Sequence, residues 1–266
     1  MKKALVLFGL AAVACSPGAK DGMTLSARIA TSDGQPLPAD GGSAQAATGI
    51  ELTRVRIAVR RLRLERRSDS FEVKIAEGPL LLDASGDKLA GALVQLVTSN
   101  VPAGTYDKLK IDIHRVDSAP AGAFDDLVQR GLSVLLEGTI DGQAFTFASA
   151  LEAELEHEGR FEVGADVSNI TLNVDASKWF LAADGSRLNP SDPANRAAIE
   201  ANIRASFRAF EDDDEDGEED HDDRDAGDDD HGHHDGGDDH GDGGHDGGDD
   251  HGGDGGSGDG GGPGHG

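Results

Sequence analysis

Polar and apolar residues alternate along most of the chain between residues 24 and 174. Leu25, Ala27 and Ile29 are separated by polar residues, and so are Val55, Ile57 and Val59. A period of two residues predicts strands with one buried face. By the same pattern, further strands are predicted at 71–75, 79–83, 106–116, 132–140, 144–149, 151–157, 160–163 and 170–174.

The alternation slips by one residue at Arg60 and Arg61 and resumes at Leu62 and Leu64. Because such a slip turns side chains to the other face, we expect a β-bulge that keeps both leucines inside. The pair Asp141-Gly142 separates two strands and is typical of a hairpin turn. Many short strands at this spacing favour an antiparallel sandwich or barrel. Our prediction is a mainly β fold, an antiparallel β-sandwich with one or two short helices.

Helical spacing predicts two helices and one further helical turn. Residues 88–96 are predicted to form a short helix, and a further helical turn is expected at 124–129. A C-terminal amphipathic helix is predicted at 193–210, because Asp192 can cap it and Pro193 suits its first turn. Its apolar residues recur every three or four positions and are expected to pack on the sheet: Ile199, Ile203, Phe207 and Phe210. Residues 31–49 are rich in Gly, Ser, Pro and Ala and are expected to form a loop or linker.

The first fifteen residues have the layout of a bacterial lipoprotein signal. Lys2 and Lys3 precede a short apolar run, and small residues lead to Cys15. The stretch resembles a lipobox, with Ala12 where Leu is commonest. The resemblance implies cleavage before Cys15 and lipid on its thiol, which anchors the chain to a membrane, with Ser16 pointing to the outer membrane of the cell envelope. An ordinary secretory signal with a chance cysteine is the alternative.

Cys15 is the only cysteine in the sequence. An exported protein with one thiol would otherwise carry an unpaired reactive group, so this supports the lipid interpretation. The mature domain therefore has no disulfide and depends on its apolar core.

The C-terminal segment, residues 211–266, has a different composition. It holds 24 acidic residues, one arginine, eight histidines and 20 glycines, and so carries 23 of the 27 net negative charges. Such a segment cannot bury a core, so we expect a disordered tail. Its charge argues against nucleic acid as a partner. The predicted organisation is a signal peptide at 1–14, a tether at 15–23, one β-rich domain at 24–210 and the tail.

The start of the tail matches the first half of an EF-hand calcium loop. Asp212, Asp214 and Asp216 alternate before Gly217, and Asp223 stands at loop position 12. Alternate carboxylates can converge on one hard cation. Two departures weaken the match, because Glu219 occupies a position that is normally apolar and no second helix follows.

Histidines follow farther along, among aspartates and glycines. Imidazole suits Zn²⁺, Ni²⁺ and Cu²⁺, and the glycines let several ligands reach one ion. Loose transition-metal capture is one hypothesis, and a solvated acidic spacer without metal is the other. The histidines concerned are His221, His231, His233, His234, His240, His245 and His251.

Within the domain no catalytic arrangement is recognisable, and no catalytic residue is predicted. His114 and His157 stand alone on predicted strands, and Glu152, Glu154 and Glu156 share one strand face, which is more typical of a solvated surface than of paired acid–base catalysts. Seven arginines crowd residues 54–67. Their expected partners are the tail, this glutamate face or anionic lipid headgroups.

One stretch resembles a family of bacterial lipoprotein domains of unknown function. The likeness covers residues 55–116 and rests on the strand from Val55 to Val59, the run Leu80-Leu81-Leu82-Asp83, and the turn from Pro102 to Tyr106 with the alternating strand after it. It implies a β-sandwich of the transthyretin or immunoglobulin type with no established activity. A weaker likeness is to copper-binding β-sandwich proteins of methanobactin operons, but paired cysteines and an aromatic-rich core are missing here.

These features predict a lipid-anchored, non-enzymatic envelope protein. Its sandwich is expected to act as a scaffold or binding module, and its tail to bind divalent cations, either calcium or zinc, nickel and copper. The alternative is a surface module that binds an envelope glycan or protein and whose tail is only a spacer.

Overall fold

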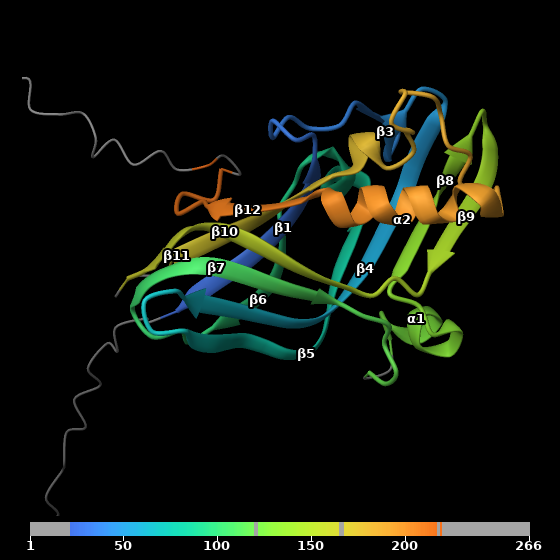
Figure 1. Ribbon diagram of the computed structural model, residues 1–266. Coiled ribbons are helices and arrows are strands. Elements are labelled where there is room, and N and C mark those ends of the chain that lie inside the picture. Colours follow the sequence, from blue (N-terminus) through green and yellow to red (C-terminus); the bar gives the residue numbers. More distant parts are fainter. Residues whose placement is uncertain (1–21, 120–121, 165–167, 217–218, 220–266) are drawn as a thin grey trace, which may run out of the picture. The chain divides into compact units, whose positions relative to one another are not determined.

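The computed structural model describes residues 22–119, 122–164, 168–216 and 219. The described chain is mainly β and forms a sandwich of two sheets around a shared apolar core, as predicted (Figure 1). None of the helices in this part of the chain is long and apolar enough to cross a membrane.

The smaller sheet has four strands in the order β12 (Phe207–Glu211), β11 (Ser168–Asp175), β1 (Met23–Ala30) and β6 (Val94–Ser99). Its central strands, β1 and β11, are parallel, whereas its outer pairs are antiparallel. Since β1 and β11 are far apart in sequence, this pair depends on long-range packing.

The larger sheet has eight strands, and β4 (Ile50–Arg66) is at its centre. The first half of β4 pairs with β8 and its second half with β7, while β3 and β5 pair along it as well. The other bounds are β2 (Ala39–Asp40), β3 (Ser43–Ala47), β5 (Phe71–Ser85), β7 (Gly104–Ile113), β8 (Val134–Ile140), β9 (Gln143–Ser149) and β10 (Ala153–Val163).

Two local predictions about these strands are confirmed. The register of β4 shifts between Val59 and Arg61 against both β5 and β7, and Leu62 and Leu64 are buried. The hairpin between β8 and β9 turns at Asp141 and Gly142, whose φ angles are +50° and +78°. Positive φ at both positions is what a two-residue hairpin requires.

The turn from Pro102 to Tyr106 leads directly into β7. Gly104 has a φ of +152°, and Tyr106 is buried with its hydroxyl donating to the Pro102 carbonyl at 2.8 Å. The hydrogen bond pins the turn to the start of β7.

The predicted helix at 88–96 is wrong. A short 3-10 helix, η1 (Gly86–Ala90), stops at Gly91 with a φ of +96°, and residues 94–99 form β6. The β-branched Val94, Val97 and Thr98 suit a strand, and pairing with β1 completes the small sheet. The expected loop at 31–49 likewise contains β2 and β3.

The C-terminal helix is shorter than predicted. It begins as expected, with Asp192 accepting from the Ala194 amide, and continues as η3 (Pro193–Asn195) and α2 (Arg196–Ala205). Ile199 and Ile203 are buried in the core. Residues 207–211 form β12 instead, because their backbone hydrogen bonds to β11 replace those of a helix.

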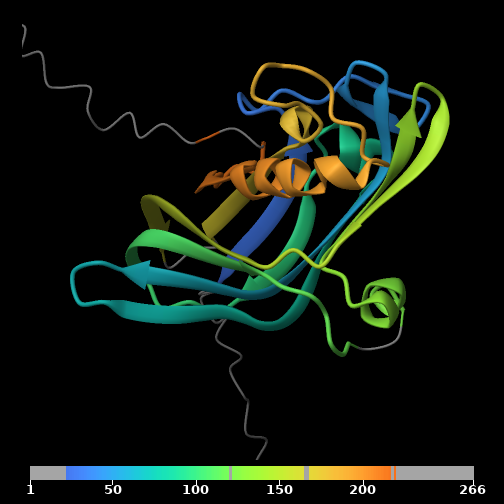
Figure 2. The ribbon, with the colours of Figure 1, turned by 45° about the vertical axis from the view of Figure 1, so that its right-hand side comes forward.

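Two smaller helices complete the fold: α1 (Asp125–Arg130), which agrees with the helical turn expected at 124–129, and η2 (Ala176–Lys178). Figure 2 shows α2 running across the strands toward β9, where Arg196 donates to the Ala148 carbonyl.

Candidate metal site

The three aspartates that open the predicted calcium loop converge. Asp212, Asp214 and Asp216 each place one carboxylate oxygen within 4.8 Å of the others. Oxygens that share one Ca²⁺ at 2.3–2.6 Å are at most about 5 Å apart. The spacing of these three groups therefore matches a single hard cation. Cys15, Asp223 and all seven predicted tail histidines lie outside the described residues.

The position of Asp212 follows from the strand before it. The Asp212 amide donates to the Asn169 carbonyl at 3.1 Å, which extends the ladder between β11 and β12 by one pair. Asp212 is fully buried, and its Oδ2 accepts from the Thr171 hydroxyl at 2.6 Å. One carboxylate of the group is thus held rigidly by the sheet.

The chain then turns sharply. The Glu215 amide donates to the Asp212 carbonyl at 3.2 Å, and Glu215 has a φ of +57°. The Asp216 amide donates to Asp214 Oδ1 at 3.3 Å. These contacts bring the exposed carboxylates of Asp214 and Asp216 back toward Asp212.

Asn169 fixes the loop from the opposite strand. Its backbone N–H donates to Asp213 Oδ1 at 3.1 Å, and its side-chain Nδ2 donates to the Asp213 carbonyl at 3.2 Å. The residue is 8% exposed, and within the described part of the chain its Oδ1 has no hydrogen-bond partner. Directly opposed residues of an antiparallel pair point to the same face, so the side chains of Asn169 and Asp212 share one face of the sheet.

Sequence reasoning missed Asn169 and Thr171 as neighbours of this loop. Their signal was the polar alternation Asn169, Thr171, Asn173 within a strand. Only the pairing of β11 with β12 places those side chains next to the aspartates.

The two domain histidines do not form a shared site. His114 Nε2 is 3.1 Å from Glu152 Oε1, and its Nδ1 is 3.0 Å from the Arg115 carbonyl. His157 lies on β10, and burial lowers the pKa of its imidazole.

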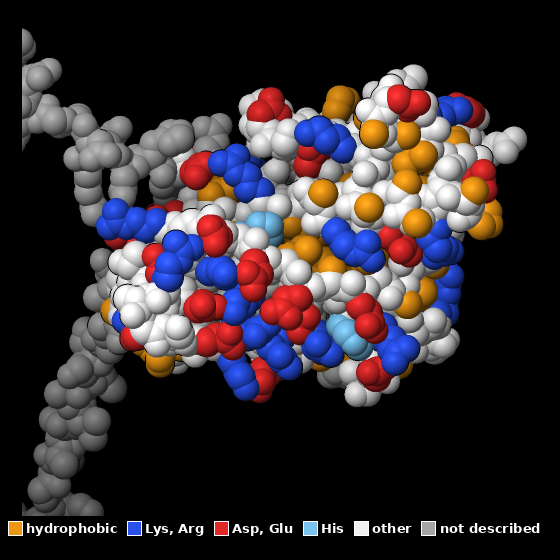
Figure 3. Space-filling view, in the orientation of Figure 1, with side chains coloured by type: hydrophobic (Ala, Val, Ile, Leu, Met, Phe, Trp, Pro, Cys, Tyr) orange, Lys and Arg blue, Asp and Glu red, His pale blue; other side chains and the backbone are white. Residues whose placement is uncertain are grey.

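The arginines of residues 54–67 have acidic partners within the domain. Arg63 bridges Glu72 and Glu154, and Arg67 pairs with Glu158. Over β7 and its neighbours, Figure 3 shows positive and negative side chains intermixed. The expected pairing with the glutamate face is thus present at Arg63. The remaining pairs are Arg54–Asp83, Arg56–Asp126, Arg60–Asp112, Arg61–Asp112 and Arg66–Asp69.

No protein-family model matches the chain, and no curated protein matches it. Among solved structures, MbnP from Methylosinus trichosporium matches with 15% identity and a TM-score of 0.34, over 71% of this chain and 99% of that chain. A similarity at this level supports no inference about function. The resemblance to bacterial lipoprotein domains therefore stays a prediction.

Proposed function

We propose that this chain is a non-catalytic, lipid-anchored binding protein of the cell envelope, and that residues 212–216 bind a hard divalent cation, with Ca²⁺ preferred. The convergence of three carboxylates carries the proposal. Ca²⁺ takes oxygen ligands from carboxylates and amides in flexible geometry. Mg²⁺ keeps several waters and is usually held through one or two carboxylates, so three converging carboxylates favour Ca²⁺.

Asn169 supports the same assignment independently. An acceptor that is buried without a partner costs about 1–3 kcal/mol, and a cation would satisfy it. The Asn169 side chain shares a sheet face with Asp212 and is bonded to Asp213, so we propose that its Oδ1 adds a neutral oxygen to the three charged ones.

The membrane anchor is proposed from the signal and Cys15. Several acyl chains, at roughly 0.8 kcal/mol per buried methylene, hold a folded domain firmly at a membrane. A Cys15→Ser variant should lose metabolic labelling by palmitate and leave the membrane fraction. Continued labelling of that variant would refute the anchor.

Calorimetric titration of the full chain in detergent tests the cation site. We expect saturable Ca²⁺ binding that weakens at least tenfold in the double variant Asp214→Asn/Asp216→Asn. The matched control is Asp249→Asn/Asp250→Asn, which removes two charges from elsewhere in the tail and should bind Ca²⁺ as the parent chain does.

The two variants separate a built site from diffuse attraction. Equal weakening in both would show that Ca²⁺ is held only by the charge of the tail. An absence of Ca²⁺ heat in the parent chain would favour the alternative function, a glycan- or protein-binding module with a spacer tail. Zn²⁺, Ni²⁺ or Cu²⁺ heat that survives in the Asp214→Asn/Asp216→Asn variant would assign those ions to the histidines.

A further inference from the structure

The outer face of the small sheet carries a row of polar side chains across three strands. Arg28 of β1 is opposite Asn173 of β11, which is opposite Arg208 of β12. Arg28 Nε donates to Asn173 Oδ1 at 3.0 Å. This places two guanidinium groups on one surface, on either side of an amide.

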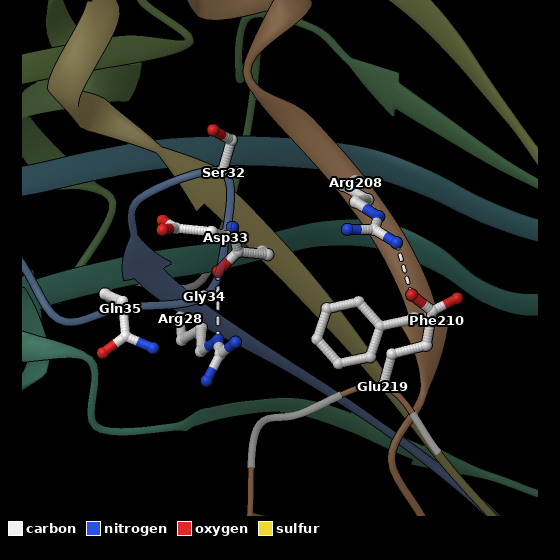
Figure 4. Close-up of a pocket in the computed structure, with 9 residues that line it drawn as sticks. Arg28, Ser32, Asp33, Gly34, Gln35, Arg208, Phe210 and Glu219 are labelled. Carbon is white, nitrogen blue, oxygen red and sulfur yellow. Dashed lines mark hydrogen bonds and ion pairs between the residues drawn. The ribbon is translucent and has the colours of Figure 1, made fainter. Parts of the chain in front are cut away.

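The row forms one wall of a hollow of about 520 Å³ (Figure 4). Phe210 lies between the arginines, and the guanidinium carbons of Arg28 and Arg208 are 5.7 and 6.0 Å from the centre of its ring. Pockets for small molecules commonly measure 300–1,000 Å³ and combine an apolar wall with a few fixed polar groups.

The loop after β1 closes the opposite wall. Asn173 Nδ2 donates to the Thr31 carbonyl at 2.8 Å, and the Gly34 amide donates to the same carbonyl at 3.0 Å. A Cβ on Gly34 would lie 2.7 Å from a terminal nitrogen of Arg28, and Gly34 has a φ of +81°. Glycine therefore allows the loop to approach Arg28 closely and hold it in place.

A carboxylate already occupies the hollow. The side chain of Glu219 pairs with Arg208, while Arg28 is only 6% exposed (Figure 4). Guanidinium groups bind carboxylates through charge-assisted hydrogen bonds. The contact shows which functional group this surface accepts.

Groups suited to hydroxyls lie beside the arginines. Ser32 Oγ accepts from Lys178 Nζ at 3.1 Å, which leaves its own proton to donate. A hydrogen bond from Thr31 lowers the pKa of Asp33, so its carboxylate is an ionised acceptor. Gln35 adds an amide to the same lining.

We propose that this hollow is a second binding site, and that it takes the carboxylate of a small hydroxylated acid, the chemistry of a uronic sugar, in exchange for Glu219. The ligand carboxylate binds Arg208, its ring lies along Phe210, and its hydroxyls meet Ser32, Asp33 and Gln35, while Arg28 holds Asn173 in the wall of the hollow. Glu219 acts as an internal competitor.

Titration of the full chain with galacturonate, followed by NMR, tests the site. EDTA in the buffer removes divalent cations, so failure here leaves the proposed cation site standing. We expect saturable binding in the millimolar range, with galactose at least fivefold weaker because it lacks the carboxylate.

Three variants identify the residues. Glu219→Gln removes the competitor and should tighten galacturonate binding severalfold, whereas Arg208→Gln should weaken it at least fivefold. Arg204→Gln removes an exposed arginine of α2 outside the hollow and should change nothing. Equal binding of galactose and galacturonate, no saturable response in the parent and Glu219→Gln chains, or equal effects of the two arginine variants would overturn the proposal. Because Glu219 is exposed, its variant gives a result even if Arg208→Gln is poorly folded.

Discussion

The two sheets use polar residues on their outer faces in opposite ways. Along β4, β7 and β10 of the large sheet, most charged side chains are matched in pairs on an exposed surface, although Arg56 and Asp112 are buried. Lys108 pairs with Glu156, and Arg67, which follows β4, pairs with Glu158. On the small sheet, Arg28, Thr171 and Asn173 are at most 6% exposed. Exposed pairs contribute little because water and salt screen them, whereas a buried polar group depends on its particular partner.

This difference between the two sheets indicates where a ligand is expected to bind. Charges that neutralise one another across neighbouring strands leave a uniform surface. The small sheet instead leaves a hollow beside Arg28 and Arg208 and a carboxylate group at the end of β12. Both proposed sites therefore lie on the polar face of the smaller sheet.

The largest expected effect is at Arg28. Arg28→Ala removes the bond to Asn173 and the contact with Phe210, and should cost about 2–4 kcal/mol of unfolding free energy. Arg67→Ala removes an exposed ion pair at 3.0 Å and should cost less than about 1 kcal/mol. Urea denaturation measures both. Similar losses of unfolding free energy in the two variants would contradict the difference between the small and the large sheet.

A smaller effect is expected at Thr171. Thr171→Val leaves the buried Asp212 carboxylate without its 2.6 Å hydrogen bond and should cost about 1–3 kcal/mol. Thr24→Val is the control, since Thr24 is half-buried and its side-chain hydrogen bond in the described part of the chain is a 3.4 Å contact with Thr98. If the Thr24 variant loses as much stability, burial is not what distinguishes these positions.

The smallest effect concerns pH and the large sheet. Hydrogen bonds from Arg54, Arg56 and Lys108 lower the pKa of Asp83, Asp126 and Glu156. A lowered folded-state pKa stabilises the protein above the unfolded pKa of about 4, and this contribution is lost as pH falls through the folded values. The urea midpoint should fall below about pH 4, and less steeply in Asp83→Asn. An unchanged slope in that variant would contradict a role for the Arg54 pair.

Local patterns predicted much of the fold correctly. The slip at Arg60, the Asp141-Gly142 turn and the Asp192 cap each depend on a few neighbouring residues, and all three appear in the structure. The helices predicted at 88–96 and at 206–210 were wrong because residues 94–99 and 207–211 become edge strands. Phe207 and Phe210 are three residues apart, which suits one helix face, but in β12 they point to opposite faces of the sheet.

The sequence alone determined that Asp212, Asp214 and Asp216 alternate within five residues, a spacing that lets one turn bring their carboxylates together. Tertiary structure alone decided that Asn169 and Thr171 stand beside them, and that Arg28, Asn173 and Arg208 form one row. The physical reason is strand pairing. Alternation within one strand shows which of its residues share a face. It does not show which strands lie beside that face. Strands β1, β11 and β12 are distant in sequence and pair only when the core forms.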